Sequence, residues 1–305
     1  MRTALETTKL SKRYGRTWAL RDCTLALPAG RVAALVGPNG AGKTTLLHLA
    51  VGLLEPTAGS VEVFGFSPRE QPKEALPRLG FVAQDHPLYK GFTVEELLTL
   101  GRKLNPRWDD ELARARIHQL GIPMQRRAGK LSGGQQAQVA LVLALAKRPD
   151  LLLLDEPLAS LDPLARREFL RTLMEAVAES GLTVLLSSHI IGDLERVCDY
   201  LVILSASQVQ LAGDIEEMVK GHKRLVGPRQ EVEALASVHT IIEASHTERQ
   251  TTLLVRTNGP VFGPTWEAQP VSLEDIVLAY LSQQAAPRQP AAPAARARRG
   301  LEVVP

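Results

Sequence analysis

Gly37 to Thr44 reads GPNGAGKT, and this stretch decides the fold. It matches the pattern G-x-x-x-x-G-K-[ST] at every position. It lies between residues 25–36, which predict strand, turn and strand, and residues 44–54, which predict a helix. In that context the glycines let backbone N–H groups surround a phosphate, the Lys43 ammonium adds positive charge, and the Thr44 hydroxyl can bind Mg²⁺. We therefore predict a phosphate-binding loop whose candidate residues are Gly37, Asn39, Gly40, Ala41, Gly42, Lys43, Thr44 and Thr45.

A second apolar run, LLLLDEP at 151–157, ends in two adjacent carboxylates. A continuous apolar run of this length predicts a strand that is buried on both faces of a parallel sheet. Asp155 would then stand at the carboxyl edge of the sheet, where it can hold Mg²⁺ together with Thr44. Glu156 follows directly, and a second carboxylate at such a place can position or deprotonate a water molecule.

A third motif, LSGGQ at 131–135, precedes an apolar run that predicts a helix over 131–146. A helix that begins at small residues presents free N–H groups and the positive end of its dipole, which suit a phosphate. The chain therefore contains a second phosphate-facing element, although the loop at 37–44 already provides one.

Strand and helix patterns alternate along most of the chain, which predicts the α/β class with a mostly parallel sheet flanked by helices. We expect one domain over 1–222, with a helical subdomain at about 88–148 that has a capping box at Thr93 and a break at Asn105-Pro106. A weaker pattern over 223–283 predicts a small α+β appendage with two paired strands and a closing helix. The Pro/Ala/Arg-rich residues 284–305 are expected to be disordered.

The composition limits the partners of the chain. Its 305 residues are 45% hydrophobic and carry a net charge of +3, so we expect no specific nucleic-acid partner. Two cysteines without CxxC spacing do not indicate a disulfide scaffold or a structural zinc site. No apolar run approaches the roughly 20 residues that span a bilayer, so a membrane role would require a separate membrane protein.

GPNGAGKTT, LSGGQ and LLLLDEP, in this order, resemble the nucleotide-binding domain of ATP-binding cassette (ABC) proteins, which has a P-loop NTPase core. The resemblance covers about residues 4–220. It implies that Tyr14 stacks on adenine and that Gln84 senses Mg²⁺ and water while facing a transmembrane partner. It also places Asp162 in the D-loop and identifies His189 as the switch histidine that contacts the γ-phosphate.

In that family two cassettes dimerise head to tail, and the signature of one subunit covers the ATP on the other. The resemblance therefore implies a second cassette, most simply another copy of this chain. Ser132 and Gly134 would reach the γ-phosphate across the interface. The signature residues expected at the nucleotide are Ser132, Gly133, Gly134 and Gln135.

The resemblance implies that the chain binds ATP and Mg²⁺ and hydrolyses the ATP. It also implies that the chain lies at the cytoplasmic face of the membrane, where hydrolysis drives transport through integral membrane permease subunits. Basic residues often follow LSGGQ in the family, but here Gln136, Ala137 and Gln138 stand in their place. The short helical subdomain and the C-terminal appendage resemble those of drug- or antibiotic-type bacterial exporters more than those of importers, whose appended domains are usually larger, so the resemblance favours an exporter. The alternative is a soluble single-cassette ATPase with a role such as metal-cluster assembly, whereas a small-molecule kinase would not need LSGGQ.

Overall fold

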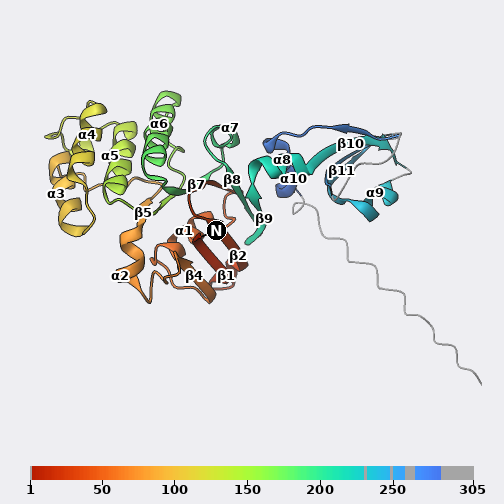
Figure 1. Cartoon of the computed structure of the whole chain (residues 1–305), viewed down its shortest axis with the longest axis horizontal. Coiled ribbons are helices and arrows are strands. Elements are labelled where there is room, and N and C mark those ends of the chain that lie inside the picture. The colour runs from red at the N-terminus through yellow and green to blue at the C-terminus, as the bar shows by residue number, and fades with distance from the viewer. Residues whose placement is uncertain (1, 230–231, 248–249, 258–264, 283–305) are drawn as a thin grey trace, which may run out of the picture.

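A six-stranded sheet forms the centre of the protein (Figure 1). The structure is a computed structural model that describes residues 2–229, 232–247, 250–257 and 265–282. The first five strands run parallel and the last runs antiparallel. Their order is β5 (Leu79–Val82), β6 (Leu151–Leu154), β7 (Thr183–Ser188), β3 (Val32–Val36), β8 (Tyr200–Ser205) and β9 (Gln208–Asp214).

Alternate side chains of these strands enter two different hydrophobic clusters. In β3, Ala33 and Leu35 pack toward α1 (Lys43–Ala50), whereas Ala34 and Val36 belong to the cluster that contains α5 (Gly133–Ala146) and α6 (Pro163–Ser180). Every residue of β3, β6 and β7 is buried, as the continuous apolar runs predict. The parallel α/β class is therefore confirmed.

A second, antiparallel sheet covers the outer side of α1. Its order is β2 (Thr17–Pro28), β1 (Thr3–Tyr14) and β4 (Ala58–Val63). Leu5 and Leu27 from this sheet share a cluster with Leu46 and Leu47 of α1, so the helix after the glycine-rich loop lies between two sheets. This burial fixes the start of α1, and therefore the loop that precedes it.

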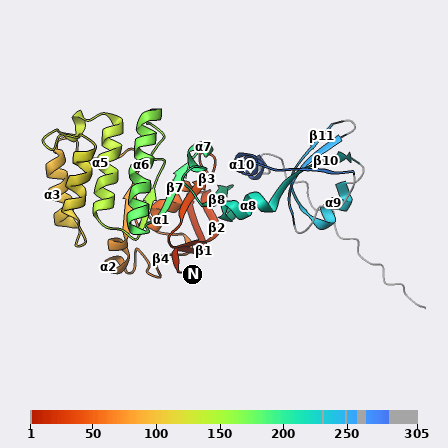
Figure 2. The same cartoon turned by 45° about the horizontal axis from the view of Figure 1, so that its top comes forward.

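The helical part of the chain lies at one end of the molecule, where α3 (Val94–Leu104), α4 (Asp110–Gln119) and α5 stand beside α6 (Figure 2). The predicted capping box is present, since the Thr93 N–H donates to Glu96 Oε2 at 2.7 Å and the Glu96 N–H donates to Thr93 Oγ1 at 3.2 Å. The predicted break at Asn105-Pro106 separates α3 from α4. The shorter helices are α2 (Pro72–Ala75), η1 (Leu76–Arg78), η2 (Ala128–Lys130), α7 (Ile191–Leu194) and α8 (Ile215–Gly221).

Two predicted helices are shorter than the sequence suggests. The helix expected over 44–54 ends at Ala50, because Gly52 takes a left-handed φ of 76°. Residues 190–198 lie between two apolar runs and predict a further helix, but only the four residues of α7 are helical. There the N–H groups of Val197 and Cys198 both bond to the Leu194 carbonyl, which closes the turn before β8.

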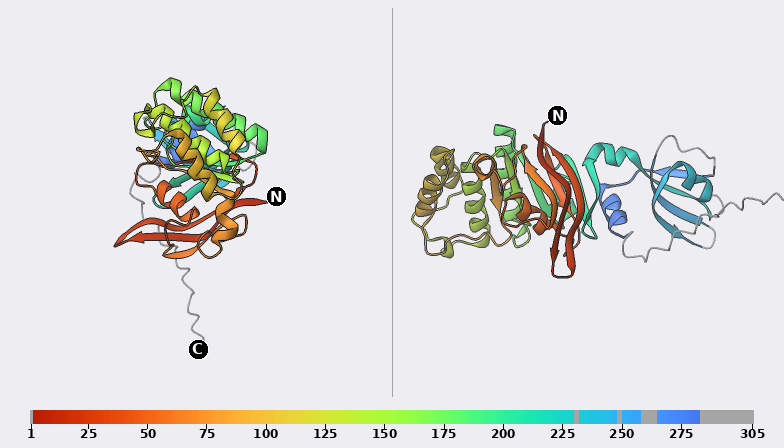
Figure 3. Two further views of the ribbon diagram at one scale, coloured as in Figure 1. Left: turned by 90° about the vertical axis from the view of Figure 1, so that its left-hand side faces the viewer. Right: turned by 90° about the horizontal axis from the view of Figure 1, so that it is seen from below.

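The appendage is a four-stranded antiparallel sheet with a helix on each side (Figure 3). The predicted pairing of its two central runs is confirmed by β11 and β12, whereas β10 and β13 were not predicted. The predicted tail at 284–305 lies outside the described residues, and the domain boundary at 222 stays a prediction. The elements are β10 (His222–Pro228), α9 (Val232–Val238), β11 (Thr240–His246), β12 (Gln250–Arg256), β13 (Glu267–Gln269) and α10 (Leu273–Ser282).

Helix α10 joins the appendage to the main core. Ile276 and Val277 are fully buried in the same cluster as Leu194 after β7 and Leu201 of β8. The hydroxyl of Tyr280 lies 3.2 Å from Nε2 of the buried His222. The end of the described chain is therefore part of the packing that supports the central sheet.

Replacing Ile276 with alanine should lower the free energy of unfolding by about 2–4 kcal/mol, since it leaves a cavity in a closed cluster. Urea unfolding measures this change. The matched control is Leu278→Ala on the same helix, which removes a side chain that is 54% exposed and should change stability by less than about 0.5 kcal/mol. Equal effects of the two substitutions would contradict the packing of α10.

Candidate nucleotide-binding and hydrolysis site

The glycine-rich loop joins β3 to α1, and two of its glycines are required by close backbone contacts. A Cβ on Gly37 would lie 2.1 Å from the carbonyl oxygen of Leu204, and a Cβ on Gly42 would lie 2.3 Å from that of Ala19. Gly42 also has a φ of 106°, which L-residues rarely adopt. The loop therefore follows a path that side chains at these two positions would block, and it leads directly into the start of α1.

Lys43 is held at the base of this loop. Its ammonium donates a hydrogen bond to the Gly37 carbonyl at 2.8 Å and forms an ion pair with Glu156 at 3.2 Å. The side chain is only 6% exposed, so the charge is held close to the loop by buried partners. A cation fixed beside a glycine-rich loop can neutralise phosphate oxygens.

Glu156 connects this lysine to His189. Its Oε1 pairs with Lys43, while its Oε2 lies 2.6 Å from His189 Nδ1. The three side chains follow β3, β6 and β7, whose carboxyl ends meet at one edge of the sheet. Glu156 has a left-handed φ of 46°, unusual for a non-glycine residue and typical of strained functional positions. At this edge of the sheet, the Glu156 carboxylate therefore lies between the Lys43 ammonium and the His189 ring.

Asp155, the residue before Glu156, is buried, with 1% of its surface exposed. Its Oδ1 accepts a hydrogen bond of 2.9 Å from the Ser187 hydroxyl, and the same hydroxyl oxygen accepts one of 2.7 Å from the Glu156 N–H. The sequence interpretation did not include Ser187. The polar pair that ends the apolar run TVLLSS was the available signal, but only the strand register shows that this hydroxyl faces the acidic pair.

A cavity of about 520 Å³ opens above these groups. It brings together the glycine-rich loop, Gln84, Glu156 and His189 from four separate segments of the chain. Its polar rim and glycine backbone suit a polyphosphate, and the Thr44 hydroxyl and the buried Asp155 carboxylate are oxygen donors of the kind that Mg²⁺ prefers. The lining residues are Ala19, Pro38, Asn39, Gly40, Gly42, Lys43, Thr44, Thr45, Gln84, Glu156, Ala159 and His189.

Gly37, Ala41 and Asp155 are next in sequence to lining residues but do not themselves line the cavity, and three other groups of predicted site residues also lie outside it. Tyr14, at the end of β1, is 50% exposed, and the Lys12 ammonium lies 5.4 Å from the centre of its ring. Asp162 caps α6 by accepting hydrogen bonds of 3.0 Å from the N–H groups of Leu164 and Ala165. The signature motif at 131–135 begins a different helix.

In the signature, Ser132 and Gln135 form a capping box at the start of α5. Ser132 and Gly133 are exposed, so the start of this helix lies at the surface of the chain. A Cβ on Gly134 would approach the Cβ of Ala165 to 2.9 Å, which explains the second glycine by packing against α6. Buried Gln138 has no hydrogen-bond partner for its side-chain amide among the described residues.

Comparison with known proteins gives the family. The family described as ABC transporter matches residues 20–159. The sulfate/thiosulfate import ATP-binding protein CysA of Yersinia pseudotuberculosis is 35% identical over 70% of this chain, and the match spans about 61% of that relative's length. The ABC transporter ATP-binding protein YtrB of Bacillus subtilis is 30% identical, with 70% of this chain and 73% of the relative covered.

Solved structures agree with these sequence matches. An ATP-binding subunit of an ABC transporter superposes with a TM-score of 0.65 at 30% identity, covering 72% of this chain and 92% of that one. A nucleotide-free ATP-binding cassette superposes with a TM-score of 0.61 at 26% identity, covering 72% of this chain and 94% of that one. The chain belongs to the family of ABC transporter ATP-binding domains, a family that binds and hydrolyses ATP.

Gly37→Ala should weaken the binding of a fluorescent ATP analogue by about tenfold or more, or ~1.4 kcal/mol. The reason is that the new Cβ displaces the loop from the Leu204 carbonyl. Fluorescence titration measures the affinity. Gly221→Ala is the control, because a Cβ at the end of α8 meets no atom within 4 Å. Undiminished binding by Gly37→Ala would show that the loop does not hold the phosphates.

Proposed function

We propose that this chain is the ATP-hydrolysing subunit of an exporter whose membrane-spanning subunits are separate proteins. The observation that carries the proposal is the meeting of Lys43, Glu156 and His189 in one cavity that the glycine-rich loop also lines. In this proposal the loop binds the phosphates of ATP, Gln84 lies beside them, and the exposed Tyr14 stacks on the adenine.

The hydrolysis step is assigned to Glu156. Its carboxylate takes a proton from the attacking water, and the His189 ring holds the carboxylate through the contact at Oε2. Lys43 provides positive charge for the oxygens that become more negative during the transfer. Thr44 and Asp155 would hold Mg²⁺, which supplies charge neutralisation when bound, with Gln84 facing the same space.

The second cassette is assigned to another copy of this chain. Ser132 and Gly133 are exposed at the start of α5 and do not line the chain's own cavity. A two-fold arrangement would place this helix start against the phosphates held by the partner, and Asp162 at the start of α6 would lie near the same interface. ATP binding then closes the dimer, and hydrolysis reopens it.

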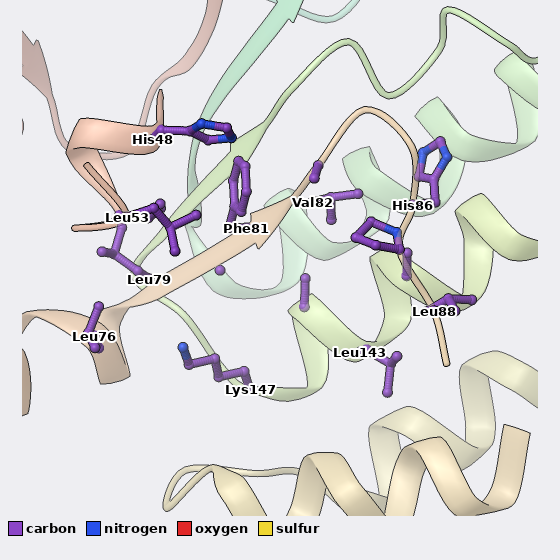
Figure 4. Close-up of a pocket in the computed structure, with 16 residues that line it drawn as sticks. His48, Leu53, Leu76, Leu79, Phe81, Val82, His86, Leu88, Leu143 and Lys147 are labelled. Carbon is purple, nitrogen blue, oxygen red and sulfur yellow. The ribbon is translucent and has the colours of Figure 1, made fainter. Parts of the chain in front are cut away.

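A groove of about 560 Å³ beside Gln84 is the proposed contact with the permease (Figure 4). It lies between β5 and α5, and its apolar wall includes Leu53, Leu76 and Leu143. Leu53 is 64% exposed and Leu76 is 38% exposed, so the groove presents several apolar side chains together, as interaction surfaces do. Lys147 also lines the groove, and burial lowers the pKa of its ammonium.

The groove is directly linked to the hydrolysis site. The link is the segment 83–88: Ala83, His86, Pro87 and Leu88 line the groove. Gln84, from the same segment, lines the nucleotide cavity. Buried His86 lies on the same segment, and desolvation lowers the pKa of its ring. A permease segment in the groove would therefore press on the residues that face ATP. None of the described helices is long and apolar enough to cross a membrane.

Export is favoured over import by the amount of sequence that lies outside the shared part. The chain spans 67% of the bacitracin transport ATP-binding protein BcrA of Bacillus licheniformis and 73% of YtrB, but about 61% of the import protein CysA. The import protein thus has more sequence beyond the shared part. A soluble single-cassette ATPase remains the alternative, and it would have no use for the exposed apolar groove.

Copurification from detergent-solubilised native membranes tests the transport role. A multi-span membrane protein in near-equal amount is expected with the parent chain. The variant Leu53→Asp should lose it while retaining ATPase turnover, whereas Leu278→Asp, a similarly exposed position on α10, should retain it. Recovery of soluble proteins alone would contradict the transporter proposal and leave the ATPase assignment intact.

If each ATP lies between two copies of the chain, Glu156→Gln should bind ATP, lose about 10²-fold or more of its turnover, and accumulate as a dimer in Mg-ATP. The amide removes the proton acceptor, while Asp155 remains. Gel filtration measures the dimer. Adding Ser132→Arg should return the protein to a monomer and leave binding of ATP to each chain nearly unchanged, because the exposed Ser132 is outside the chain's own cavity. A monomeric Glu156→Gln protein in Mg-ATP would count against the closed dimer.

A further inference from the structure

One buried hydroxyl connects the two acidic residues of the site. Ser187 is the penultimate residue of β7 and has no exposed surface. Its Oγ donates to Asp155 Oδ1 at 2.9 Å and accepts from the Glu156 N–H at 2.7 Å. A single side chain thereby contacts the proposed metal carboxylate and the backbone of the proposed general base.

Each of these bonds restricts one degree of freedom. The bond to Oδ1 fixes the rotation of the Asp155 carboxylate, and so the direction of its other oxygen. The bond from the Glu156 N–H holds the backbone at the residue whose φ is 46°. Parallel pairing of β6 with β7 ends at Leu154 and Leu186, so the ladder itself does not hold these two groups.

We propose that Ser187 is a positioning residue for ATP hydrolysis, which sets the separation and orientation of Asp155 and Glu156. Partners of a metal ligand that hold it by a hydrogen bond commonly affect metal affinity and turnover without touching the substrate. The inference concerns the hydrolysis chemistry, so it stands whether the chain drives export, import or a soluble process.

A purely structural role is the competing explanation, because any buried hydroxyl with two partners contributes to stability. The two explanations differ in what they predict for metal binding. A positioning role requires the Mg²⁺ site to weaken when the hydroxyl is lost. A structural role predicts lower stability with normal metal affinity in the protein that remains folded.

The test uses the full chain with Ser187→Ala and follows Mn²⁺, in place of Mg²⁺, by electron paramagnetic resonance in the presence of a non-hydrolysable ATP analogue. Mn²⁺ affinity and kcat should each fall by about tenfold or more. The KM for ATP, and the affinity for the analogue in excess chelator, should stay within about twofold, because the phosphate-binding loop is unchanged. Ser187→Thr, which keeps the hydroxyl, should restore most of both losses.

Thr183→Val provides the stability control. Thr183 is a buried hydroxyl at the other end of β7 and accepts a hydrogen bond from the Gly30 N–H at 2.9 Å, far from the acidic pair along the strand. The Thr183→Val variant should be less stable than the parent and should bind Mn²⁺ with the affinity of the parent. If Ser187→Ala does not fold, Ser187→Cys keeps the side-chain size with a weaker hydrogen bond and gives the same comparison. The proposal would be overturned if Ser187→Ala bound Mn²⁺ within about twofold of the parent, or if Thr183→Val lost as much Mn²⁺ affinity as Ser187→Ala.

Discussion

The parallel register of β6, β7 and β3 is the constraint on which the site depends. Val36 pairs with Ser188, so β3 and β7 end at one level of the sheet, and Leu154 pairs with Leu186, so β6 ends two residues earlier at the same edge. The residues that follow them therefore emerge side by side. A shift of one residue in any strand would turn its last side chain to the other face of the sheet and separate the acidic pair from the lysine.

Much of the site can be predicted from sequence because its groups occur in short contiguous motifs. In two motifs, GPNGAGKT and LLLLDEP, the functional residues directly follow an apolar strand, so the sequence pattern alone places them at the carboxyl end of that strand. The prediction for His189 depends on its place at the end of a third apolar run and on the family resemblance. Ser187 could not be assigned in this way, because its role depends on pairing between strands that lie about 30 residues apart.

The parts of the fold that the sequence did not reveal are mostly half-exposed strands. β1 contains buried and exposed residues in an irregular order, and its backbone has a left-handed φ of 46° at Lys9, where pairing with β2 shifts register. The alternation that identifies a strand is therefore lost. β13 has only three residues and is defined by its pairing with β10, which is a tertiary contact.

Helix α10 has a consequence for how the protein is made. The cluster that packs one face of the central sheet includes Leu273, Ile276 and Val277, which come after nearly all other residues of that cluster in the chain. During synthesis the strands and the nucleotide loop leave the ribosome first, and that face of the sheet stays partly uncovered until the last helix follows. The nascent chain would thus hold an unfinished core until residue 282 is released, and premature termination just before α10 would yield a cassette with every motif present and an open apolar face.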